Sequence, residues 1–278
     1  MPIQSEAPSR RVRLFSAFGA GAGIGGIGGL IGLGGAEIRL PVLLALGYEA
    51  LPAIIMNRVL SLVVVVFALP SRASTIPFAD VAAHWPVITT LLSGSLIGAW
   101  TGATYATRFA SRTLFRTISV MLVVTAVMLA LGDDRDLHHM PIDGTVRVVV
   151  GVVAGFGIGL TVALMGVSGG ELLVPTLVLL FGLPVKLAGS VALAISLPTL
   201  LVGFARFGRD NTLGVVQANL SFLALMAAAS MLGAFLGGQL LGVVPASALL
   251  PLLGLVLLGS AWKIWRHGAQ QPAGGPHA

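Results

Sequence analysis

Two ten-residue segments, 32–41 and 166–175, carry the residues of this chain that could do chemistry. The first reads Gly-Leu-Gly-Gly-Ala-Glu-Ile-Arg-Leu-Pro and the second reads Gly-Val-Ser-Gly-Gly-Glu-Leu-Leu-Val-Pro. Glu37 and Glu171 lie 134 positions apart, and each stands beside a Gly-Gly pair inside a long apolar stretch. A carboxylate is costly in apolar surroundings, so a pair at matching positions indicates a shared functional centre.

The glycine pairs favour the binding of an anion. A helix that begins at Gly35 or Gly170 directs its unpaired backbone N–H groups into the interior, where these donors and the helix dipole attract negative charge. Two such helix ends that meet at mid-membrane would form a site for a small oxyanion. Arg39 or Arg58 would add a planar, bidentate contact to it.

The two glutamates have three interpretations. Glu37 and Glu171 lie in the first turn of their predicted helices, where a carboxylate caps free N–H groups. A buried carboxyl group that takes up a proton as an anion binds would instead couple the movement of the two. An ion pair with Arg39 or Arg58 is the third possibility.

Composition places the chain in the membrane. Of its 278 residues 56% are hydrophobic and only 9% are charged, and the mean hydropathy is +0.98, whereas soluble domains have about 25% charged residues. The net charge of +6 is explained by arginines in short loops that orient membrane helices, so no nucleic-acid partner is expected. With no cysteine, disulfide and thiolate chemistry are excluded.

The apolar runs predict an all-α integral membrane protein of two homologous repeats. Eight long transmembrane helices are expected at about 13–33, 51–70, 84–107, 113–131, 145–166, 186–205, 214–242 and 245–265. Two shorter pieces, 36–47 and 170–182, follow the glycines. Because 12 residues at about 1.5 Å each reach only about 18 Å, we interpret these pieces as half-helices, so that each repeat contains a broken helix at its Gly-Gly-Glu motif.

The same pattern predicts the domain boundaries. Residues 1–13 form a cytoplasmic N-terminal tail, 14–131 the first repeat, 132–144 a polar linker, 145–265 the second repeat, and 266–278 a disordered C-terminal tail. His138 and His139 in the linker have no third metal ligand nearby, so no metal site and no cofactor are expected.

Arginine and lysine positions indicate that both termini are cytoplasmic. Whether the repeats are inverted or parallel, ten basic residues fall on the N-terminal side and four opposite. Under the inverted arrangement the four are Arg72, Arg135, Arg147 and Lys186. We favour this arrangement because it puts the cluster Arg108, Arg112 and Arg116 in the cytoplasm and the acidic linker on the other face. It leaves Glu37, Glu171, Arg39 and Arg58 as the charged residues of the apolar segments.

Glycines recur at intervals of four residues in several predicted helices. They are Gly19, Gly21, Gly23, Gly25 and Gly29, then Gly151, Gly155 and Gly159, and finally Gly233 and Gly237. Small residues at this spacing let helices approach closely in lipid, and they also permit bending. We favour the interpretation that they serve helix packing.

The repeated segments resemble the TauE/SafE sulfite exporter family. The resemblance is carried by 32–43 and by Ala53 to Arg58 in the first half, and by 166–175 and 188–190 in the second. It extends over about residues 14–265. The positions that match the family's motifs are Gly34, Gly35, Glu37, Pro41, Asn57, Arg58, Gly169, Gly170, Glu171, Pro175 and Ser190. Ala36, Met56 and Ser168 depart from its pattern.

The resemblance implies a bacterial inner-membrane permease for sulfite, an organosulfonate or another sulfur-containing oxyanion, coupled to protons. The expected substrate-binding residues are Gly34, Gly35, Asn57, Arg58, Ser168, Gly169, Gly170 and Ser190, with Glu37 and Glu171 in proton coupling or helix capping. The expected partners are the anion, protons, the lipid bilayer and further copies of the chain in a homo-oligomer. The alternatives are a non-transporting membrane scaffold and a membrane-embedded enzyme. No catalytic set of residues is visible, so an enzyme is not expected.

Overall fold

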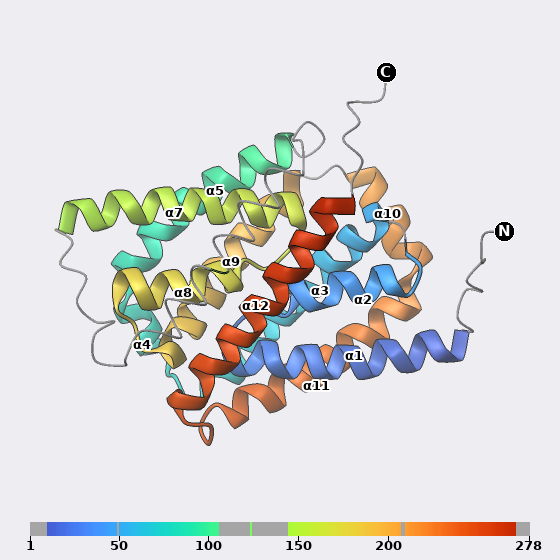
Figure 1. Cartoon of the computed structure of the whole chain (residues 1–278), viewed down its shortest axis with the longest axis horizontal. Helices are drawn as coiled ribbons and strands as arrows, with labels where there is room; N and C mark the ends of the chain where they lie inside the picture. The colour runs from blue at the N-terminus through green and yellow to red at the C-terminus, as the bar shows by residue number, and fades with distance from the viewer. Residues whose placement is uncertain (1–9, 49, 106–122, 124–143, 207–208, 271–278) are drawn as a thin grey trace.

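The regular structure of the described part of the chain is entirely α-helical (Figure 1). The computed structural model describes residues 10–48, 50–105, 123, 144–206 and 209–270. Its helices are α1 (Arg10–Ile31), α2 (Ala36–Ala45), α3 (Ala50–Ser71), α4 (Phe78–Ala83), α5 (Trp85–Tyr105), α7 (Gly144–Met165), α8 (Gly170–Phe181), α9 (Val185–Arg206), α10 (Arg209–Ala218), α11 (Leu220–Leu240) and α12 (Ala246–Gln270). Apart from residue 123, the helix expected at 113–131 lies outside the described residues, as do residues 132–143 of the linker.

Five of these helices are long and apolar enough to cross a membrane. The candidate spans are Pro52–Ser71, Trp85–Thr104, Gly144–Leu164, Val185–Ala205 and Leu220–Leu240. Shorter apolar helices run over Ala17–Ile31, Gly170–Phe181 and Ala246–Gly259. The prediction of an all-helical membrane protein is therefore confirmed in its coarse form.

One predicted helix is divided in the structure. The apolar run 214–242 is split at Asn219 between α10 and α11. The amide of Asn219 donates to the carbonyl oxygen of Val215 at 2.9 Å, near the end of α10. Asparagine favours such ends because its short side chain competes with the helix for backbone groups. The six-residue helix α4 after Pro77 was not expected either.

The short helices α2 and α8 each turn back along the helix before them. A Cβ on Gly35 would lie 2.8 Å from the carbonyl oxygen of Ile24, and Leu43 near the end of α2 shares a buried cluster with Ala17 of α1. Likewise, a Cβ on Gly151 near the start of α7 would lie 2.9 Å from the ring of Phe181 at the end of α8. Each pair therefore starts and ends on the same side of the molecule.

The sharp reversals depend on glycine. In the first, Gly32, Gly34 and Gly35 have φ of +90°, +74° and +70°. In the second, Gly166 and Gly169 have φ of +67° and +77°. Residues with a side chain rarely adopt this left-handed conformation, so the backbone conformation of the two segments requires glycine at these positions.

Two pairs of parallel helices pack through glycines. Along α1, Cβ atoms on Gly25 and Gly29 would lie 2.7 Å from the Cα atoms of Ser230 and Ala234 in α11. The pair α5 and α7 makes equivalent contacts, with a Cβ on Gly159 lying 2.7 Å from the Cα of Ser95. These glycines support helix packing, as small residues do in membranes. A Cβ added to Gly19 or Gly23 would have no atom within 4 Å, so these two glycines do not contribute to this interface.

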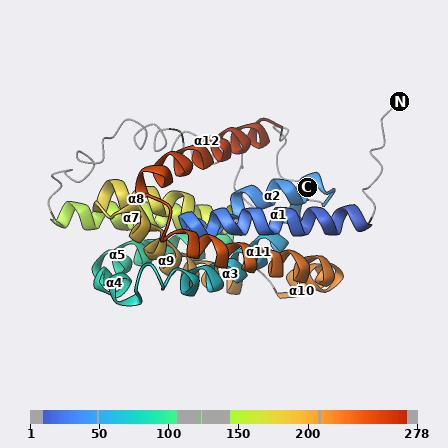
Figure 2. The ribbon, with the colours of Figure 1, turned by 90° about the horizontal axis from the view of Figure 1, so that it is seen from below.

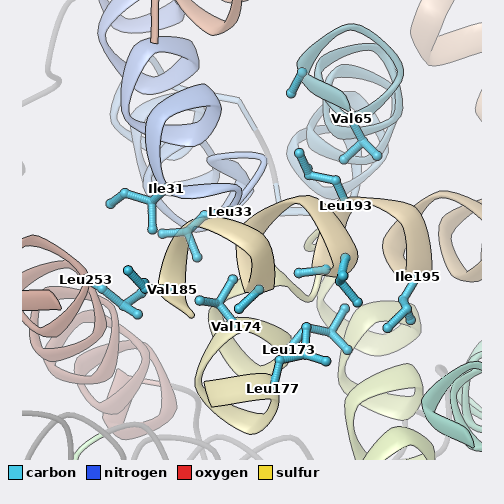
Figure 3. Close-up of a cluster of buried hydrophobic side chains, with 14 of the residues drawn as sticks. Ile31, Leu33, Val65, Leu173, Val174, Leu177, Val185, Leu193, Ile195 and Leu253 are labelled. Atoms are coloured by element: carbon cyan, nitrogen blue, oxygen red, sulfur yellow. The ribbon is translucent and has the colours of Figure 1, made fainter. Parts of the chain in front are cut away.

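The helix contacts occur in matched pairs around α3 and α9, which touch each other. α1 packs on α11 as α7 packs on α5, α3 contacts α11 as α9 contacts α5, and α2 contacts α3 as α8 contacts α9. Figures 1 and 2 show the α1–α11 and α5–α7 pairs on opposite sides of the central helices. A large buried cluster joins both halves of the chain, with Ile31, Leu33 and Val65 beside Leu173, Val174 and Leu193 (Figure 3).

The close approach of α1 and α11 predicts an effect of a single methyl group. We expect Gly25→Ala to lower stability by about 1–3 kcal/mol, because the added carbon would displace the backbone of α11 at Ser230. Gly23→Ala, half a turn away in the same helix, meets no neighbour and should retain or raise stability, since alanine favours helix. Thermal unfolding in detergent measures both variants. Equal midpoints would contradict the packing role.

Candidate functional site

The two glycine-rich interruptions, residues 32–35 between α1 and α2 and residues 166–169 between α7 and α8, lie against each other. The hydroxyl of Ser168 donates a hydrogen bond to the carbonyl oxygen of Leu33. A Cβ on Gly34 would lie 2.7 Å from Oγ of Ser168, and a Cβ on Gly170 would lie 2.7 Å from the Cα of Leu33. The structure therefore brings together Gly34, Ser168 and Gly170 from the two halves of the sequence.

The same contact brings two helix N-termini together. α2 has 10 residues and starts at Ala36, and α8 has 12 residues and starts at Gly170. The first four N–H groups of a helix have no partner within the helix, and they carry the positive end of its dipole. Both interruptions are buried. This arrangement is suited to holding a small anion.

A chain of hydrogen bonds through α3, which we call the α3 network, connects the two interruptions. Arg39 donates to the carbonyl of Gly34 and to the hydroxyl of Ser61, both at 3.4 Å. Ser61 donates to the carbonyl of Asn57 at 2.7 Å, and the amide nitrogen of Asn57 donates to the carbonyl of Gly166 at 3.3 Å. Arg39, Asn57 and Ser61 are fully buried. Of the residues in this network, Gly34 and Asn57 were expected in the substrate site, and Arg39 was one of two candidate cations.

Arg58, expected to bind substrate, supports the end of α7. Its Nη2 donates to the carbonyl oxygen of Ala163 at 2.6 Å. The last four carbonyl groups of a helix lack helical partners, and Ala163 lies among them, so this guanidinium stabilises the C-terminus of α7. A cation at this end is also favoured by the helix dipole.

Arg72 lies in the turn directly after α3 and its candidate membrane span, as predicted, but its side chain is buried, which the sequence did not predict. Its side chain is fully buried and donates to the carbonyl groups of Gly29 and Leu30, at 2.7 and 2.8 Å, near the end of α1. It also donates to the carbonyl of Lys186 at 2.7 Å and to the hydroxyl of Ser190 at 3.0 Å. Burial lowers the pKa of Arg72, which directly follows the Pro52–Ser71 span, to about 10, so it stays protonated at neutral pH.

Ser190 lies beside the end of α1 with Arg72. A Cβ on Gly189 would lie 2.6 Å from Nη2 of Arg72, and a Cβ on Gly32 would lie 2.5 Å from the Cα of Gly189. This contact resembles the one in the other half, where a Cβ on Gly166 would lie 3.0 Å from the side chain of Ile54. Ser190 therefore borders the first interruption, whereas Asn57 and Arg58 border the second.

The remaining predicted residues lie at the same two places. A Cβ on Gly35 would face Ile24, and a Cβ on Gly169 would face the side chain of Val162 at 2.6 Å. Glu171 is buried in the first turn of α8. Glu37 is the second residue of α2, and its side chain is outside the described part of the structure.

Sequence reasoning missed the roles of Arg72 and Lys186, because it assigned both to loops. The ammonium group of Lys186 donates to the carbonyl of Leu241 at 2.8 Å, at the end of α11. A hydrogen bond of 2.8 Å between Ser95 and Thr199, which joins α5 to α9, was not anticipated either. Arg72 and Lys186 lie at helix ends, and Ser95 and Thr199 lie in apolar runs. Nothing in the sequence around these four residues indicates their distant hydrogen-bond partners.

Comparison with known proteins identifies the family. The model of the sulfite exporter TauE/SafE family matches residues 17–271, nearly the whole chain. No curated protein and no solved structure matches. The match confirms the resemblance carried by the two Gly-Gly-Glu segments, and with five candidate membrane spans it is typical of a membrane transport protein. The chain belongs to the sulfite exporter TauE/SafE family.

Proposed function

We propose that this protein is an inner-membrane permease for a small sulfur-containing oxyanion, sulfite or an organosulfonate, and that protons accompany the anion. The observation that carries the proposal is the meeting of the α2 and α8 N-termini through Ser168 and Leu33. The family supports the class of substrate. Family membership also favours a transporter over an enzyme.

The proposed anion site lies between residues 34–37 and 168–171. Backbone N–H groups from both helices bind the anion, and the glycines let it approach the backbone closely. The guanidinium of Arg39, which reaches the carbonyl of Gly34, adds positive charge at the edge of this site. Arg58 supports the site indirectly, because its hydrogen bond to Ala163 stabilises the end of α7 that precedes the second interruption.

We further propose that the chain consists of two inverted repeats, 14–131 and 145–265, with both termini in the cytoplasm. The matched helix contacts support two equivalent halves. The reversal of α2 along α1 supports inversion: a pair that starts and ends on one side, followed by three crossings, leaves the second repeat to begin on the opposite side. The third of these crossings is the helix predicted at 113–131.

Counterflow tests transport directly. We expect proteoliposomes loaded with unlabelled sulfite to accumulate labelled sulfite from outside, to a level several-fold above protein-free liposomes. A membrane scaffold would give no accumulation, so counterflow separates the two classes of protein. Loss of the signal with labelled sulfite and with labelled alkanesulfonates alike would overturn the proposed function.

The buried carboxyl of Glu171 predicts a pH-dependent flux. A carboxyl that takes up a proton as the anion binds makes flux respond to a pH gradient, and a glutamine cannot do so. We expect Glu171→Gln, or Glu37→Gln at the equivalent position of α2, to reduce the stimulation of sulfite flux by a pH gradient about tenfold. Asp80→Asn, which alters an exposed acid in α4, is the matched control. Unchanged stimulation in both glutamine variants would rule out proton coupling through these residues.

Substitution of Arg39 should weaken anion binding, whereas substitution of Arg72 should lower stability. Arg39→Gln should raise the KM for the anion roughly tenfold or more, because a charge-assisted contact at the site is lost. Arg72→Gln should lower the unfolding temperature without a specific change in KM, because it leaves carbonyl groups of α1 without donors. Counterflow kinetics and thermal unfolding of both variants measure the difference. An unchanged KM in Arg39→Gln would remove Arg39 from the site.

A further inference from the structure

In the side-chain amide of Asn57, the nitrogen forms a hydrogen bond and the oxygen does not, among the described residues. It is fully buried, and its Nδ2 donates to the carbonyl of Gly166 in the second interruption. Its Oδ1 is buried and has no hydrogen-bond partner among the described residues. The orientation is fixed by Gly166, because exchanging oxygen and nitrogen would place two acceptors against each other. A buried acceptor without a donor is unfavourable, so Oδ1 is suited to a group that arrives with the substrate.

This oxygen differs in kind from the groups that we expect to hold the charge of the anion. Helix N-termini and the guanidinium groups of Arg39 and Arg58 offer only hydrogen-bond donors, and they suit the charged oxygens of an anion. Oδ1 of Asn57 is an acceptor, and it repels lone pairs. It is therefore complementary to a hydroxyl or amino hydrogen carried beside the charged group.

We propose, on the basis of the anion site above, that Asn57 selects monoanions that carry a hydrogen-bond donor close to their charged oxygens. Hydrogen sulfite in its O–H form and hydroxyalkanesulfonates belong to this class. Doubly ionised sulfite and plain alkanesulfonates do not. Asn57 is then the specificity-determining residue, and the second interruption fixes its orientation through Gly166.

Two sulfonates that differ in one group test this selection. 2-Hydroxyethanesulfonate and propane-1-sulfonate have the same charge and the same number of heavy atoms, and a hydroxyl in the first replaces a methyl in the second. We expect the hydroxyl compound to inhibit labelled sulfite counterflow at about a tenfold lower concentration, because it satisfies an otherwise unpaired acceptor. The comparison uses the unaltered protein at one pH on both sides of the membrane.

Variants assign the preference to a residue. Asn57→Leu, which keeps a similar volume without the acceptor, should bring the two inhibitory concentrations together. Ser196→Ala is the matched control, since Oγ of Ser196 in α9 is also buried without a hydrogen-bond partner among the described residues. It should leave the tenfold preference unchanged. A preference that survives in Asn57→Leu would overturn the assignment to Asn57.

The outcomes separate this inference from the function on which it rests. Equal inhibition of the unaltered protein by the two sulfonates, with counterflow intact, would overturn the selection and leave the permease standing. Absence of counterflow with every anion would overturn both. If Asn57→Leu does not fold, the comparison of the two sulfonates on the unaltered protein still decides whether the donor is selected.

Discussion

Backbone carbonyl groups at the ends of α1 and α7 impose the constraint on which this fold depends. Both helices stop in the buried centre of an apolar protein, where a carbonyl without a donor costs several kcal/mol. Arg72 donates hydrogen bonds to the carbonyls of Gly29 and Leu30, and Arg58 donates one to the carbonyl of Ala163. Because both arginines belong to one stretch of chain, α3 and the residue after it, a single element holds both interruptions in place.

This use of arginine also bears on the proposed anion site. At each interruption a helix C-terminus, with its partial negative charge, meets a guanidinium group, while the following helix presents its N-terminus. Arg72 donates to carbonyl and hydroxyl oxygens, which accept hydrogen bonds without cancelling a full charge. Arg72 therefore stabilises the end of α1 and also adds positive charge near the first interruption.

The sequence predicted features that depend on local residues and missed those that depend on distant ones. The glycines with positive φ and the short apolar pieces after them are local, and α2 and α8 begin at or within a residue of the predicted positions. Arg72 follows an apolar run, so a charge count assigns it to a loop. Its burial depends on a distant partner, because it donates to the carbonyl of Gly29, which lies 43 positions earlier. Asn57 was expected in the site, but its hydrogen-bond partner Gly166, 109 positions away, was not predicted.

The two halves share a backbone plan but not a set of side chains. The position of Arg39 in the first copy is taken by Leu173 in the second, and Leu173 packs in the hydrophobic core. Ser61 joins the α3 network, whereas the hydroxyl of Ser196 on α9 has no partner among the described residues. At these two positions, therefore, only the first half contributes polar side chains to the hydrogen-bonded network. In the proposed site the N-termini of α2 and α8 attract the charge of the anion, and we attribute selectivity among anions to α3.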